Sequence, residues 1–144
     1  MAIIYHPRPG QILLCDFAPG FKEPEMVKEK RPVVILTGAI KGRANLVTVV
    51  PLSHSEPSPP QLYHYKIPKS SLPMLGNFQD SNSWLKGDMI YTVGFHRLTL
   101  IRLGVKGPDG KRVNFKKRLG LEQMKSIYQC VMHGLNLSKL AAYI

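Results

Sequence analysis

The sequence predicts a mainly β fold, a small and strongly bent β-barrel closed by a helix near the C-terminus. Short apolar runs rich in β-branched residues recur along the chain, and polar segments containing Gly and Pro separate them. A stretch near the C-terminus shows helical periodicity. The chain has 144 residues, the length of one ordinary domain. We therefore interpret 1–144 as a single domain, with a core over about 10–133 and an extension over 134–144.

The N-terminal part is expected to contain an arm, a strand and a long loop. Prolines at positions 7 and 9 disfavour regular strand pairing in the first nine residues. The apolar run Gln11–Phe17 is typical of a strand, and the charged segment 18–30 follows it with Pro19-Gly20 as a turn signal. A loop of this length inside a small domain is more often functional than idle, so we interpret it as a mobile flap.

The chain is organised around two strands, Lys28–Leu36 and Asn45–Ser53, with a polar turn over 37–44 between them. Both are apolar and β-branched, which is typical of neighbouring antiparallel strands. Arg31 lies near the start of the first strand, and Ser53 and His54 close the second. Since a hairpin places the start of one strand beside the end of the other, these three side chains are expected to be neighbours. A cation beside a hydroxyl and an imidazole is suited to holding a phosphate.

Further along, short strands are expected to alternate with irregular segments. The proline-rich residues 55–60 cannot form a helix or a central strand, and residues 69–84 are expected to form a loop. The predicted strands in this part of the chain are 62–67 and 87–93, and residues 97–102 are expected to begin a short strand or an extended turn. A hairpin of 103–106 with 111–115 is expected around the turn Gly107-Pro-Asp-Gly110.

The C-terminal region predicts one convincing helix, which begins near position 121. Its apolar residues recur at helical spacing on one face, where they are expected to pack on the core. That face comprises Leu121, Met124, Ile127, Tyr128 and Val131. Gly134 is placed to end the helix, and residues 136–144 are expected to form a further short helix.

The charge points to a polyanionic partner. Twenty Lys and Arg against nine Asp and Glu give a net charge of +11 and a pI near 9.9. A cationic surface gains affinity for nucleic acid by releasing counterions from phosphates. The sequence contains no apolar run of membrane-spanning length and no zinc-type Cys or His spacing, so we expect no membrane segment, no metal and no cofactor. Two cysteines, Cys15 and Cys130, suggest buried free thiols in the cytoplasm.

Several motifs together resemble the PemK/MazF family of toxin endoribonucleases. They are Gly10-Gln-Ile-Leu-Leu-Cys-Asp-Phe17, the charged loop, Lys30-Arg-Pro-Val-Val-Ile-Leu36, Val49-Val-Pro-Leu-Ser53, Trp84-Leu-Lys-Gly-Asp-Met-Ile-Tyr91 and the terminal helix. The resemblance covers roughly residues 10–133. It implies an SH3-like barrel that dimerises, cleaves single-stranded RNA without a metal, and is silenced by an antitoxin.

The resemblance also implies site residues. The catalytic Arg and the catalytic Ser or Thr of the family fall on Arg31 and Ser53, and its substrate-gripping flap falls on 21–30. His54 is a further candidate acid or base, since its ordinary pKa is near neutrality. The candidate RNA-binding residues are Lys22, Lys28 and Lys30 in the flap, Trp84 as a stacking platform, and His96 with Arg97 at a strand end.

The sequence departs from the family pattern in the strand that corresponds to 89–94. Some members carry an Arg and an Asp there as proton carriers, whereas this chain has Tyr91, Thr92 and Gly94. The general acid and base therefore remain unassigned by the resemblance. Two alternatives stay open on the same scaffold: a non-catalytic nucleic-acid-binding barrel, and a module that binds a peptide. Of the three, the sequence favours the RNA-cleaving toxin.

Overall fold

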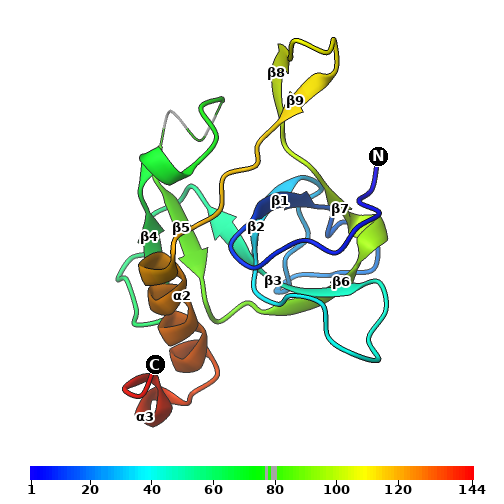
Figure 1. Cartoon of the computed structure of the whole chain (residues 1–144). Coiled ribbons are helices and arrows are strands. Elements are labelled where there is room, and N and C mark those ends of the chain that lie inside the picture. Colours follow the sequence, from blue (N-terminus) through cyan, green and yellow to red (C-terminus); the bar gives the residue numbers. More distant parts are fainter. Residues whose placement is uncertain (77, 79–80) are drawn as a thin grey trace.

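The computed structural model describes residues 1–76, 78 and 81–144 and contains a sheet of seven strands (Figure 1). Its strands follow the order β4-β5-β3-β2-β1-β7, and β6 pairs with β3 beside that path. Their bounds are β1 (Ile12–Cys15), β2 (Arg31–Ile35), β3 (Leu46–Ser53), β4 (His64–Ile67), β5 (Ser83–Lys86), β6 (Tyr91–Gly94) and β7 (Leu98–Thr99). The predicted mainly β fold with a C-terminal helix is confirmed.

β3 is the longest strand and joins the parts of the sheet. One edge pairs with β2, while its first half pairs with β6 and its last two residues pair with β5. Its side chains alternate between two buried clusters, as a strand covered on both faces requires. Val47 and Val49 pack in one cluster, and Val50 and Leu52 pack in the other.

The helix α2 (Leu121–Gly134) covers one of these clusters and lies beside β4 (Figure 1). Met124, Ile127 and Cys130 are its buried residues. The prediction that Leu121 belongs to the buried face is wrong, because this first residue of the helix is 90% exposed. The predicted end at Gly134 is confirmed, and a short helix α3 (Ser138–Ala141) follows.

Several predicted strands are shorter in the structure, and two further boundaries differ near β5 and β6. The expected loop over 69–84 contains the 3-10 turn η1 (Lys69–Ser71) and ends in β5, so Trp84 lies in a strand and not in the loop. Residues 77 and 79–80 of the expected loop lie outside the described residues. The strand expected over 87–93 begins later, at Tyr91, because Gly87 and Asp88 form a turn. Pairing with β3 and β4 on its two sides explains why so short a segment as β5 is a strand.

After β6, the 3-10 turn η2 (Phe95–Arg97) leads into β7. The predicted hairpin that follows is confirmed as β8 (Arg102–Lys106) and β9 (Arg112–Asn114), a separate two-stranded sheet that projects from the body of the molecule (Figure 1).

Both cysteines are buried and free, as predicted. Burial raises the pKa of Cys15 to about 12 and that of Cys130 to about 11, so both remain thiols near neutral pH. Across the described part of the chain, no helix combines the length and the apolar character needed to cross a membrane.

Candidate active site

Arg31 begins β2 at the point where β3 ends. The two strands are antiparallel, with Val33 opposite Pro51, and the same register continued by two residues places Arg31 opposite Ser53. The guanidinium is half-buried, and its Nη1 donates a hydrogen bond of 3.2 Å to the Leu52 carbonyl oxygen. Burial lowers the pKa of Arg31, but a guanidinium stays charged near neutral pH. The side chain is therefore a fixed cation at the end of β3, with further N–H donors free to meet an anion.

Ser53 is the last residue of β3 and is 9% exposed. Its Oγ accepts a hydrogen bond of 3.2 Å from the backbone N–H of Ser55. Because a hydroxyl can accept and donate at once, the O–H of Ser53 remains able to donate to a phosphate oxygen. Ser53 is also paired with Trp84 across β3 and β5, so these two side chains lie on the same face of the sheet.

His54 follows directly and packs edge-on against Phe78, with ring centroids 5.7 Å apart. The pKa of His54 is lowered, first by burial and then by the nearby charge of Arg31, while a hydrogen bond with the Asn82 backbone acts in the opposite direction. The imidazole is therefore neutral near pH 7 and able to accept a proton. The effect of the Arg31 charge on His54 is consistent with their places at the start of β2 and just after the end of β3.

Among the described residues, five buried side-chain N or O atoms have no hydrogen-bond partner, and three of them belong to residues at this end of the sheet. These three are Arg31 Nε, His54 Nδ1 and Ser83 Oγ, and the other two are His6 Nε2 and Arg43 Nε. Leaving such an atom unsatisfied costs roughly 1–3 kcal/mol, so natural proteins keep few of them, and those that persist often serve a function. The cluster is consistent with a site at which a polar ligand completes the hydrogen bonding.

The predicted flap between β1 and β2 is held in place by specific contacts. Met26 N donates to the Tyr91 hydroxyl oxygen at 2.9 Å, and Phe17 N donates to the Lys28 carbonyl at 2.9 Å. Phe21 packs against the rings of Phe17 and Tyr91. Lys22, Lys28 and Lys30 are exposed on this loop, as RNA contacts would require. No local sequence pattern indicates that Tyr91 holds the flap, since this contact joins residues 65 positions apart.

Arg97 and His96 lie on the other side of β1 from Arg31. Cys15 pairs with Arg31 in β2 and with Leu98 in β7, so β1 separates the two arginines. Arg97 Nη1 donates to the Asp16 carbonyl at 3.0 Å, and its guanidinium lies 4.8 Å from the centre of the Phe21 ring. These contacts give Arg97 a structural task at the base of the flap, while His96 is exposed. The structure thus groups Arg31, Ser53 and His54 and places His96 and Arg97 apart.

Comparisons with known proteins identify the family of the chain. A family model described as the PemK-like, MazF-like toxin of type II toxin–antitoxin systems matches residues 8–133. The chain belongs to this family. YifN of Escherichia coli (strain K12), an uncharacterized protein, is 29% identical over 117 residues, which cover 71% of this chain and 78% of YifN.

Solved structures of PemK/MazF-like proteins share the fold. MazF from Deinococcus radiodurans is 12% identical with a TM-score of 0.60, covering 92% of this chain and 99% of that one. An endoribonuclease from a mycobacterial species, solved in complex with its cognate antitoxin, is 18% identical with a TM-score of 0.58. The match covers 91% of this chain and 96% of the endoribonuclease. These likenesses support the expected mainly β toxin fold.

An open cavity of about 1130 Å³ lies next to the candidate active site. The N-terminal arm over 1–7 forms part of its wall, together with Lys30, Phe78, Arg102 and Arg112. Phe78 also contacts His54, so the cavity borders the candidate catalytic residues. Sequence reasoning missed Phe78, Arg102 and Arg112; the run of basic residues from 102 to 118 was the available signal for the two arginines. Among the described residues, no group of three His, Cys, Asp or Glu side chains could hold a metal ion.

Proposed function

We propose that this chain is a metal-independent, sequence-selective endoribonuclease of the mRNA-interferase type, acting on single-stranded RNA in the cytoplasm. The observation that carries the proposal is the meeting of Arg31 and Ser53 where β2 begins and β3 ends, with the guanidinium fixed on the Leu52 carbonyl. Membership of the PemK-like, MazF-like toxin family supports it, as does the description of a structural neighbour as an endoribonuclease. The exposed lysines of the flap supply the cations that an RNA backbone needs.

The reaction needs no nucleophile from the protein, because the ribose 2′-OH can attack the adjacent phosphorus. That attack breaks the bond to the 5′ oxygen and leaves a 2′,3′-cyclic phosphate and a 5′-OH end. Arg31 stabilises the negative charge that grows on the phosphorane oxygens, and the Ser53 hydroxyl donates to one of them. Neutral His54 accepts the proton of the 2′-OH, and the departing 5′ oxygen takes a proton from solvent.

The proposed partners are an antitoxin and a second copy of the chain. The mycobacterial neighbour was solved with its cognate antitoxin, which supports a protein inhibitor for this family member as well. The net charge of +11 suits an acidic inhibitor that competes with RNA. A homodimer is proposed on the family resemblance, and sedimentation at several concentrations tests it.

The 2′-OH is the direct test of this chemistry. End-labelled RNA is incubated with the protein in excess EDTA, and a matched RNA carries a 2′-deoxy sugar on the 5′ side of each mapped cut. The proposal predicts discrete cuts with cyclic phosphate ends in the first RNA, and protection of those positions in the second. RNA that is bound but left intact would show a non-catalytic binder instead.

A further inference from the structure

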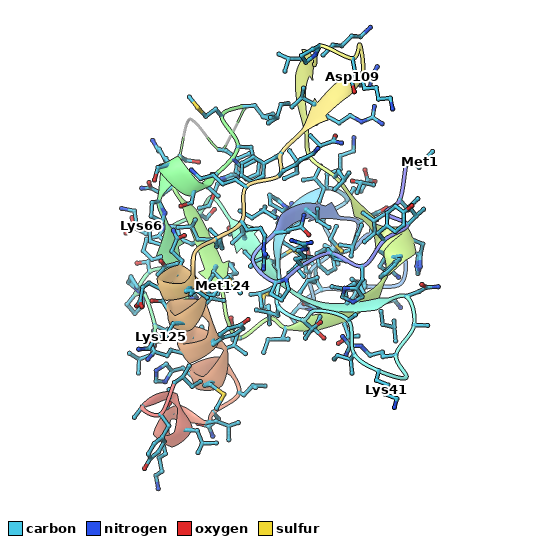
Figure 2. All side chains as sticks on the ribbon, in the orientation of Figure 1. Met1, Lys41, Lys66, Asp109, Met124 and Lys125 are labelled. Carbon is cyan, nitrogen blue, oxygen red and sulfur yellow. The ribbon has the colours of Figure 1, made fainter. Side chains whose placement is uncertain are left out.

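The β8–β9 hairpin carries a concentration of positive charge that the proposed catalytic site does not use. Residues 102–118 contain seven Lys and Arg and one Asp, a net charge of +6 within the chain total of +11. Arg102, Lys106, Lys111 and Arg112 are all exposed on the hairpin. The acidic residue, Asp109, lies at the tip (Figure 2) and accepts a hydrogen bond of 3.0 Å from Lys111 N within the turn.

The strand pairing of the hairpin brings two positive charges together, and a bound anion would reduce their repulsion. Lys106 lies directly opposite Arg112 in the two-stranded ladder. Like charges at facing positions of a hairpin repel each other and destabilise it. A phosphate between or beside them removes that repulsion, so this arrangement favours a polyanion as the partner.

Two other basic residues of the run are occupied by structural contacts. Lys117 Nζ donates to the Ser70 carbonyl at 2.7 Å, and Arg118 donates through Nε and Nη2 to the Pro9 carbonyl at 3.0 and 2.8 Å. These bonds fix the segment between the hairpin and α2. The hairpin therefore projects from an anchored base. Within the described part of the chain, the exposed side chains of Lys106, Lys111 and Arg112 make no such contact and can bind an anion.

The cavity links the hairpin to the candidate active site. Arg102 and Arg112 line it at the hairpin end, while Lys30 and Phe78 line it close to Arg31 and His54. Exposed Tyr5 and Ile4 form part of the wall. Cations combined with an exposed aromatic ring are suited to single-stranded nucleic acid, in which phosphates and unpaired bases are both accessible.

We propose that the β8–β9 hairpin and the cavity at its base bind the stretch of RNA that flanks the cleaved phosphate. Arg102, Lys106 and Arg112 contact its phosphates, and the cavity wall receives its bases. This inference rests on the proposed ribonuclease function for the position of the strand, but RNA binding by the hairpin can be measured without cleavage.

The test compares two triple variants with the same loss of charge. The hairpin variant is R102Q, K106Q and R112Q; the control is K41Q, K125Q and K139Q, three exposed lysines on the 37–44 turn, α2 and α3. Lys41 and Lys125 lie on the side of the molecule away from the hairpin (Figure 2). Fully 2′-O-methylated RNAs of about 4 and about 16 nucleotides, which cannot be cleaved, are titrated over a range of salt.

For the long RNA, the logarithm of the association constant is expected to fall less steeply with the logarithm of the salt concentration in the hairpin variant, with a slope smaller in magnitude by about 2. At about 0.1 M salt this difference corresponds to about 100-fold weaker binding. Binding of the short RNA, and both affinities of the control variant, are expected to stay near the wild-type values. A photo-crosslinking base at the end of the long RNA is expected to attach to residues 102–115 of the wild-type protein, which tests the contact without any substitution.

Equal losses in the two variants, or crosslinks elsewhere, would overturn the inference. So would a hairpin variant that binds RNA normally but loses self-association in sedimentation, since the hairpin would then contact a second copy. If the wild-type protein binds long RNA through the hairpin yet never cuts unmodified RNA, the proposed catalysis fails while the binding surface remains. If cleavage occurs and the hairpin variant binds as the wild type does, the surface alone is refuted.

Discussion

Arg31 and Leu52 are joined by a hydrogen bond of 3.2 Å between the guanidinium Nη1 and the backbone carbonyl oxygen. This bond ties the cation to the residue that precedes Ser53. It limits the positions that the guanidinium can take, so its remaining donors are directed before a substrate arrives. Preorganised donors of this kind stabilise a transition state without a cost of reorganisation during the reaction.

Arg31→Lys should slow single-turnover cleavage by about 100-fold or more. An ammonium is a point charge on a flexible stem, and it cannot hold the Leu52 carbonyl and present a planar pair of donors to a phosphate together. Arg43→Lys is the matched control, because Arg43 is also held by hydrogen bonds, to the Thr37 and Thr48 hydroxyls, but in the 37–44 turn. A control as slow as Arg31→Lys would indicate a general loss of structure.

The cleavage rate should fall on the acid side of pH 6.5. The pKa of His54 lies below its ordinary value of 6.5, so the imidazole is neutral at pH 7 and gains its proton only as the pH falls through that lowered pKa. His54→Asn should slow cleavage and remove this acid limb from the pH profile. His64→Asn is the control and should retain the fall in rate at acid pH. The pKa of His64 is lowered too, but this side chain lies at the start of β4, where its Nδ1 accepts a hydrogen bond from Gln61 N. An unchanged profile in His54→Asn would rule out His54 as the base.

Tyr91→Phe should loosen the flap while leaving the chemical step intact. The substitution removes the hydroxyl that accepts from Met26 N at 2.9 Å and keeps the ring that packs against Phe21. One such bond is worth about 1 kcal/mol, so KM should rise about fivefold with little change in kcat. Amide exchange over 21–28 should speed up in parallel. Tyr63→Phe, at a tyrosine that packs edge-on against His64, is the control and should show neither effect.

Gly134→Ala should destabilise the protein by about 2 kcal/mol or more, measured by urea unfolding. In the interior of a helix, alanine in place of glycine is stabilising by roughly 0.5–1 kcal/mol. Here the added Cβ would collide with the Gly87 carbonyl and lie 2.7 Å from Asp88 Cα, because the helix end meets the turn after β5 at very close range. Gly38→Ala, whose Cβ would find Pro9 at 3.7 Å, should change stability little. A neutral Gly134→Ala would show that this contact can relax.

The sequence was sufficient to predict the central hairpin, and with it the closeness of Arg31, Ser53 and His54. Two apolar, β-branched runs joined by a polar turn predict an antiparallel pair, so the start of one strand is expected beside the end of the other. The terminal helix could be predicted from the helical spacing of its apolar residues. Its buried face nevertheless includes Cys130 and leaves out Leu121.

Contacts between distant segments could not be predicted. β5 has four residues, and partners on both sides determine its structure more than its own composition does. The Tyr91 contact to the flap, Phe78 against His54, and the cavity wall of Arg102 and Arg112 depend on tertiary packing that no local pattern records. The close approach of Gly87 and Gly134 belongs to the same group.

In the proposed reaction, Arg31 and Ser53 act on one phosphate without a metal. Single-turnover rates in excess EDTA for the wild type, Arg31→Ala, Ser53→Ala and the double variant test it most directly. If both side chains stabilise the same transition state, each single variant should be slow and the double variant should be little slower than the worse single one. Effects that multiply as for independent sites, or cleavage that appears only when a divalent metal is added back, would contradict the account.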